Sequence, residues 1–139
     1  MSREITLQIG GSAAELARIN AAVEDLAETE GWPAELVFQT TLVLEELEVN
    51  IMNYAYGDDE SVQSRITLRS EPDRLTIEIS DSGKAFNPLE DAREPDLDAA
   101  LEDRRIGGLG IHFVRTLMDE VSYRREDGRN HLTLVKRRD

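Results

Sequence analysis

The chain has 139 residues, of which 40% are hydrophobic, a composition typical of one globular domain and too apolar for a disordered chain. The net charge of −13 disfavours nucleic acids and anionic membranes as partners, and the absence of cysteine excludes disulfides and thiolate metal sites. Since no apolar stretch approaches the roughly 20 residues that span a bilayer and the N-terminus has no apolar signal core, we expect a single cytoplasmic domain over residues 1–139.

The first half of the chain predicts one strand followed by two helices. Apolar and polar side chains alternate over 3–9, which is typical of a strand with one buried face. Apolar residues then recur at helical spacing over about 16–29, and again over about 36–56. A Gly-Trp-Pro sequence separates the two helices, and its proline suits a first helical turn. We expect Trp32 and Phe38 to pack in the core.

The second half predicts four strands, a long loop and one helix. The predicted elements are strands near 66–68 and 75–79, a loop over 81–106, a helix that opens at Gly107-Gly108, and strands near 120–126 and 130–136. Glu71-Pro72-Asp73 and Asp127-Gly128 are typical of hairpin turns between the paired strands. This order of elements predicts an α+β fold with a layer of helices over a mixed sheet.

The second predicted helix carries a carboxylate and a carboxamide on one face. Glu46 and Asn50 are four residues apart, so their side chains lie side by side on a helix. An amide oxygen is a hard ligand that suits Mg²⁺, and a carboxylate can orient or deprotonate a nucleophile. The alternative is a solvated acidic face, because polar pairs at this spacing are common.

A second polar group follows the apolar strand near 75–79. Asp81 ends this strand, and a carboxylate there can accept a hydrogen bond from an exocyclic amine such as that of adenine. Gly83 allows the backbone to pass close to a flat base. The alternative is an ordinary Asp-Ser-Gly turn.

The third group is the glycine-rich sequence Gly107–Gly110, which opens a predicted helix. Glycines at this place let the first N–H groups of the helix face phosphate oxygens. The sequence is neither a P-loop nor a dinucleotide fingerprint. Arg104 and Arg105 precede it and could bind terminal phosphate oxygens. Alternatively, these arginines pair with Glu102 and Asp103.

The order of these three groups resembles the GHKL ATPase superfamily, which includes the histidine-kinase catalytic domain. Glu46–Asn53 resembles its N box, Asp81–Phe86 its first glycine box and Gly107–Gly110 its second, and the resemblance covers about 3–136. It implies the Bergerat ATP-binding fold, a two-layer sandwich of helices over a mixed, mainly antiparallel sheet. Within the superfamily, the single short domain, Glu46 in the N box and the sequence 107–119 resemble the anti-sigma-factor serine/threonine kinases.

This resemblance implies ATP and Mg²⁺ as cofactors and a role for each matching residue. Glu46 is the expected base toward a serine or threonine hydroxyl, Asn50 the Mg²⁺ ligand, and Asp81 the reader of the adenine amine. Residues 84–106 would form a lid over the nucleotide. The remaining expected nucleotide contacts are Asn53, Gly83, Ala85 (where many members have a second glycine), Arg105, Gly107, Gly108, Leu109 and Gly110.

The resemblance also implies partners. It indicates an antagonist of the STAS type as the phosphorylated protein, a sigma factor as a further partner, and a homodimer as an open alternative to a monomer. Two other functions stay open at this point. One is an ATP-binding module that sequesters a sigma factor or another regulator without kinase activity. The other is a detached histidine-kinase catalytic domain.

Overall fold

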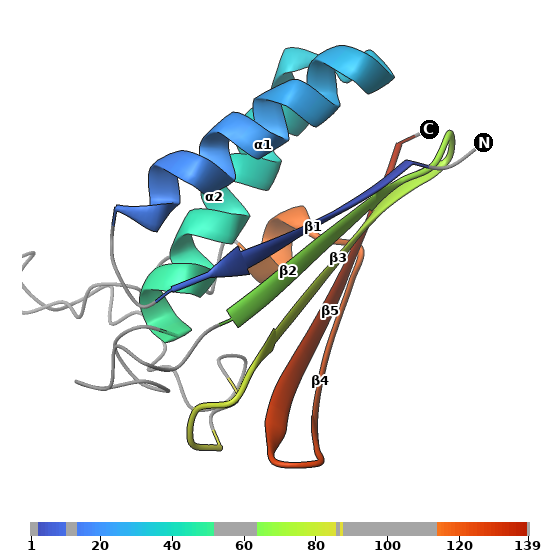
Figure 1. Cartoon of the computed structure of the whole chain (residues 1–139). Helices are drawn as coiled ribbons and strands as arrows, with labels where there is room; N and C mark the ends of the chain where they lie inside the picture. Colours follow the sequence, from blue (N-terminus) through green and yellow to red (C-terminus); the bar gives the residue numbers. More distant parts are fainter. Residues whose placement is uncertain (1–2, 11–13, 52–63, 86, 88–113, 139) are drawn as a thin grey trace, which may run out of the picture.

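The computed structural model describes residues 3–10, 14–51, 64–85, 87 and 114–138. Within these residues, helices cover one face of a five-stranded sheet and leave its other face uncovered (Figure 1). The predicted α+β class, a layer of helices over a sheet, is confirmed. None of the helices in the described part is long and apolar enough to cross a bilayer.

Two long helices form most of the helical layer. Helix α1 spans Glu15–Glu30 and helix α2 spans Ala34–Asn50, while a short helical segment occupies 114–117. The chain leaves α1 at Gly31, where a φ of 68° places the backbone in the left-handed region that favours glycine. Both helices were predicted from their apolar spacing; the part of the second prediction beyond residue 51 lies outside the described residues.

The sheet has the strand order β1-β2-β3-β5-β4. Its strands are β1 (Arg3–Ile9), β2 (Ser64–Ser70), β3 (Arg74–Asp81), β4 (Glu120–Glu126) and β5 (Arg129–Arg137). All four pairings between these strands are antiparallel, so the described sheet is antiparallel throughout rather than mixed. The predicted hairpin between β4 and β5 is confirmed, with positive φ at both Asp127 and Gly128.

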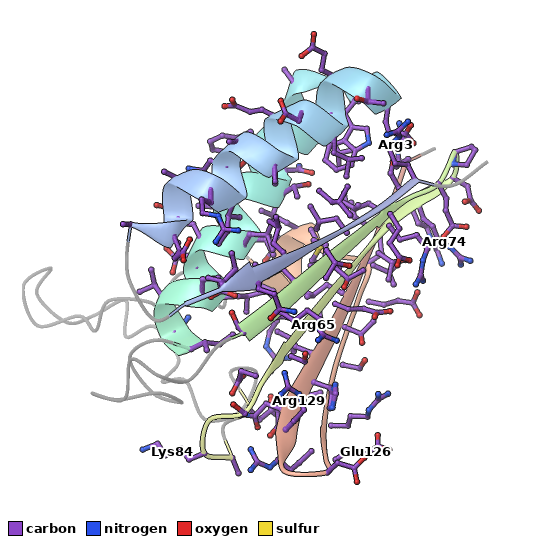
Figure 2. The ribbon with its side chains drawn as sticks, viewed as in Figure 1. Arg3, Arg65, Arg74, Lys84, Glu126 and Arg129 are labelled. Carbon is purple, nitrogen blue, oxygen red and sulfur yellow. The ribbon has the colours of Figure 1, made fainter. Side chains whose placement is uncertain are left out.

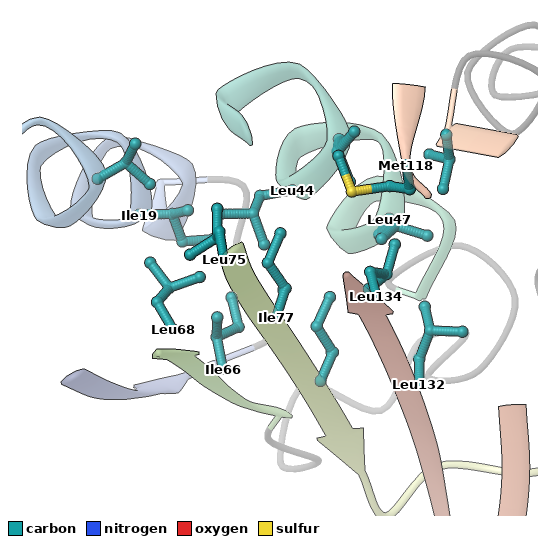
Figure 3. Packing of buried hydrophobic residues seen from close by; sticks show 14 of the residues in the cluster. Ile19, Leu44, Leu47, Ile66, Leu68, Leu75, Ile77, Met118, Leu132 and Leu134 are labelled. Atoms are coloured by element: carbon teal, nitrogen blue, oxygen red, sulfur yellow. The ribbon is translucent and has the colours of Figure 1, made fainter. Parts of the chain in front are cut away.

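The core lies between the helices and one face of the sheet. Antiparallel register brings Leu7, Ile66, Ile79, Leu132 and Tyr123 into one row across the five strands, all on the face toward the helices. A neighbouring row is apolar in the same way, and Figure 3 shows side chains of both helices packed against these strands. Burial of this apolar surface is the main force that holds the two layers together.

The two aromatic residues expected in the core behave differently. Trp32 is buried, and its indole N–H donates to the hydroxyl of Ser70 over 3.0 Å. Phe38 is 68% exposed, so its predicted burial is wrong. The buried face of α2 includes Leu36 and Thr40, and Phe38 lies two residues from each. Since two residues advance a helix by roughly 200°, the side chain of Phe38 points to the opposite side, into solvent.

One end of the inward face is polar. The row Ile9, Ser64, Asp81, Asn130 and Arg125 crosses the five strands next to the apolar row that contains Ile66. Ser64, Asp81 and Asn130 are each at most 4% exposed, although they are polar. Buried polar side chains need hydrogen-bond partners, so this end of the sheet is where a site is expected.

The different environments of Leu44 and Phe38 predict opposite effects on stability. Leu44→Ala should lower the free energy of unfolding by about 3 kcal/mol, because it leaves a cavity at a position with 0% exposure. Phe38→Ala, on the same helix, should change it by less than about 0.5 kcal/mol. Urea unfolding measures both values. A loss for Phe38→Ala as large as that for Leu44→Ala would contradict this account of α2.

Candidate functional site

The candidate site lies where the last turn of α2 meets the polar row of the sheet. Glu48 of α2 joins the two, because both of its carboxylate oxygens lie 3.2 Å from the hydroxyl of Ser64. Ser64 is paired with Asp81 in the register of β2 and β3. The structure therefore brings the end of α2, which carries Glu46 and Asn50, to the same end of the sheet as Asp81 (Figure 1).

Glu46 combines partial burial with a nearby like charge. Its side chain is half-buried, and burial is the main cause that raises the pKa of its carboxyl, followed by the negative charge of Glu45. A raised pKa makes the ionised carboxylate a stronger base than an ordinary surface glutamate. The solvated acidic face that the sequence also allowed describes Glu45, which is exposed, better than Glu46.

Asn50 presents an unsatisfied acceptor. The residue is 1% exposed, and its side-chain N–H donates to the carbonyl oxygen of Glu46 over 2.9 Å. Its Oδ1 is buried and has no hydrogen-bond partner among the described residues. A buried acceptor without a partner is unfavourable unless a ligand satisfies it. An amide oxygen is a suitable ligand for Mg²⁺, so this atom fits the metal that the sequence implied.

Asp81 has one engaged and one available carboxylate oxygen. Its Oδ1 accepts hydrogen bonds from the backbone N–H of Gly83 and from Nδ2 of Asn130, each over 2.9 Å. The first of these forms the Asp-Ser-Gly turn that was the alternative interpretation, so the turn and a ligand-binding role are compatible. Within the described part of the chain, Oδ2 accepts no hydrogen bond from protein. This oxygen can accept one from an amine of a ligand.

Several residues of this site were not singled out from the sequence. Glu48 and Ser64 join α2 to the sheet, and Asn130 and Arg125 surround Asp81 from strands that lie more than 40 residues further along the chain. The Asn-x-Leu-x-Leu alternation of β5 places Asn130 on the inward face, which is a weak signal that a period-two analysis could have found. Glu48 continues the row Leu36, Thr40 and Leu44 at intervals of four residues along α2, so the helical period is a signal of its burial.

The other predicted contacts are only partly described. Gly83 is buried and Ala85 is exposed, both directly after β3. Asn53, Arg105, Gly107, Gly108, Leu109 and Gly110 lie outside the described residues, as does most of the expected lid. Their roles stay predictions.

Comparison with known proteins identifies the family. The model of the histidine kinase-like ATPase domain matches residues 11–136, and the chain therefore belongs to this family. The chain is similar to the serine/threonine-protein kinase BtrW of Bordetella bronchiseptica, with 33% identity over 96% of this chain and 94% of the relative. It is also similar to the serine-protein kinase RsbW of Listeria monocytogenes, with 26% identity over 92% and 83% of the two chains.

A solved structure supports the same fold. A chain in the SiaB–SiaC complex of Pseudomonas aeruginosa superimposes with a TM-score of 0.63 at 19% identity, over 96% of this chain and 89% of that one. At this identity the likeness concerns the fold. The resemblance to the GHKL superfamily that the sequence motifs indicated is confirmed by the family model and by the curated relatives.

Glu48 predicts an unusual pH dependence of stability. Burial raises the pKa of its carboxyl to about 7 from 4.5, helped by the charge of Asp81 and opposed by the hydrogen bond from Ser64. Folding therefore favours the protonated form, and the stability associated with it is complete below about pH 4.5 and is lost as the pH rises through about 7. Glu48→Gln, which is neutral throughout, should be more stable than wild type by about 3 kcal/mol near pH 8.5.

The advantage of Glu48→Gln should shrink as the pH falls from about 7 and vanish below about 4.5, where the wild-type carboxyl is protonated in both the folded and the unfolded state. Denaturant unfolding at several pH values measures it. The exposed neighbour Glu45→Gln is the matched control and should show little of this pH dependence. A constant difference between Glu48→Gln and wild type across the range would show that the buried carboxyl does not titrate as described.

Proposed function

We propose that this chain is an ATP-dependent serine/threonine protein kinase that phosphorylates a protein antagonist in a partner-switching module controlling a sigma factor. Membership of the histidine kinase-like ATPase family and similarity to curated serine/threonine-protein kinases support the phosphotransfer. The observation that carries the proposal is the buried Oδ1 of Asn50, which has no hydrogen-bond partner in the described part of the chain and lies beside Glu46, at the same end of the sheet as Asp81.

ATP would lie across this end of the domain. Its adenine would donate the exocyclic amine to Asp81, with Gly83 and Ala85 beside the base, and its phosphates would extend toward Asn50. The further phosphate contacts would come from Asn53, Arg105, Gly107, Gly108, Leu109 and Gly110. Bound Mg²⁺, held by Oδ1 of Asn50, would neutralise phosphate charge and help to align the γ-phosphate.

The reaction is an in-line displacement at the γ-phosphorus. The hydroxyl oxygen of a serine or threonine on the antagonist forms the new P–O bond while the bond to the β–γ bridging oxygen breaks, which releases ADP. Glu46 accepts the hydroxyl proton. The raised pKa of Glu46 supports this role, because a stronger base takes the proton more readily.

The partners follow from this reaction. The antagonist would be of the STAS type, and a sigma factor would bind the chain when the antagonist is phosphorylated. The acidic composition supports protein partners rather than nucleic acid, and a cytoplasmic location suits this role. A homodimer is a further proposal that sedimentation analysis would test.

The proposed base makes the first test of function. The purified chain with Mg²⁺ and γ-labelled ATP should transfer acid-stable phosphate to a cognate antagonist. Glu46→Gln should lower the turnover rate at least about 100-fold while ATP affinity stays within about twofold, because a general base acts in the chemical step. Glu35→Gln, which changes an exposed carboxylate in the first turn of α2, is the control. Transfer by Glu46→Gln at the wild-type rate would exclude Glu46 as the base.

The same assay separates the two other functions. Tight ATP binding without transfer to any partner would favour the sequestering module. Acid-labile phosphate on the acceptor would favour a detached histidine-kinase catalytic domain.

The proposed metal ligand makes a second test. Wild-type affinity for ATP should be higher in Mg²⁺ than in EDTA, and Asn50→Ala should remove most of this difference, because it removes the amide oxygen offered to the metal. Calorimetry measures both affinities. Asn20→Ala on α1 is the matched control. If Asn50→Ala kept the full effect of Mg²⁺, the metal would be held elsewhere.

A further inference from the structure

The hairpin of β4 and β5 holds the segment that follows β3. Nη1 of Arg125 donates to the carbonyl oxygen of Gly83 over 2.8 Å, and Nδ2 of Asn130 donates to the carbonyl oxygen of Lys84 over 2.9 Å. Figure 2 shows Lys84 at the same end of the sheet as the turn of this hairpin. These bonds lie beyond the strand pairing of β3, which ends at Asp81, so they fix backbone that the sheet itself does not fix.

The amide of Asn130 has a defined orientation. Its Oδ1 accepts from the hydroxyl of Tyr123 and, over 3.2 Å, from Nη1 of Arg125, while its Nδ2 donates to Oδ1 of Asp81 over 2.9 Å. The arginine can only donate, and ionised Asp81 can only accept, so the opposite amide orientation would lose these bonds. Asn130 is 4% exposed, and in this low-dielectric environment the network holds the carboxylate firmly.

The network also distinguishes the two oxygens of Asp81. Oδ1 receives two donors, from Gly83 and Asn130, whereas Oδ2 receives none from the described residues. A carboxylate held in this way cannot rotate without breaking two charge-assisted hydrogen bonds. Oδ2 is therefore the oxygen presented to a ligand.

We propose that Arg125 and Asn130 are positioning residues that determine the specificity for adenine, by holding Asp81 and the Gly83–Lys84 segment so that Oδ2 accepts the exocyclic amine. This inference rests on the proposed function, because it requires that Asp81 reads adenine. It assigns to the β4–β5 hairpin a role in nucleotide selection, although Arg125 itself need not touch the nucleotide.

The test compares ATP with inosine triphosphate, which has a carbonyl oxygen in place of the adenine amine. Calorimetry of the full chain with each nucleotide and Mg²⁺ should give a wild-type preference for ATP. Arg125→Ala and Asn130→Ala should each weaken ATP binding about tenfold and leave inosine triphosphate within about twofold, since only the bond to the amine depends on the orientation of Asp81. A purely structural role would weaken both nucleotides equally.

The chain offers a matched control on the same strand. Arg124 is adjacent to Arg125 but lies on the other face of β4, where it forms an exposed ion pair with Glu126. Arg124→Ala should leave the ratio of the two affinities unchanged. If Asn130→Ala does not fold, Tyr123→Phe and Arg125→Lys weaken the same network more mildly and should lower the ratio in the same direction.

Asp81→Asn should reverse the nucleotide preference rather than only weaken it. In this variant Gly83 and Asn130 would still donate to the amide oxygen, so its NH₂ group would replace Oδ2 and face the base. The preference should then reverse in favour of inosine triphosphate, and adding Asn130→Ala should weaken the reversal at least about threefold, because the amide could rotate.

The outcomes separate two kinds of failure. A wild-type chain that binds neither nucleotide, or binds both equally, would overturn the assignment of Asp81 to adenine and this inference with it. A wild-type preference for ATP that Asp81→Asn removes, but that Arg125→Ala and Asn130→Ala both retain in full, would overturn this inference alone.

Discussion

The site depends on the antiparallel register that lines up Ser64, Asp81 and Asn130 across β2, β3 and β5. Side chains alternate between the two faces of a strand, so a slip of one residue would turn all of these groups toward the uncovered face. The apolar row next to them, which contains Ile66 and Ile79, prevents such a slip because it is buried against the helices. Core packing therefore fixes the position of the polar row.

The position of α2 relative to this row follows from a second buried group. Glu48 is 0% exposed and meets Ser64, although burial of a carboxyl near Asp81 is unfavourable. Because two residues advance a helix by roughly 200°, Glu46 and Asn50 lie on the other side of α2, about one turn apart from each other. The contact of Glu48 with the sheet thus joins the part of the site that would act on phosphate to the part that would read the base.

Local patterns in the sequence were sufficient to predict α1, α2 and the five strands, and to place Glu46 and Asn50 as neighbours on α2, because these features follow from spacing within one element. The contacts of Asn130 and Arg125 with the Asp81 turn were not predictable in this way, because they join strands that are distant in sequence and depend on register. Phe38 was wrongly expected in the core for a different reason, because its position two residues from the buried Leu36 and Thr40 already places it on the other side of α2. The order of the three motifs indicated the family, whereas the network around Asp81 required the fold.

A crystal structure of the chain with Mg²⁺ and a nonhydrolysable ATP analogue tests the central claim, that the polar row and the end of α2 form one nucleotide site. We expect the adenine amine within about 3 Å of Oδ2 of Asp81, and Oδ1 of Asn50 at about 2.1 Å from the metal. A base bound away from Asp81, or a metal without Asn50 among its ligands, would contradict the account.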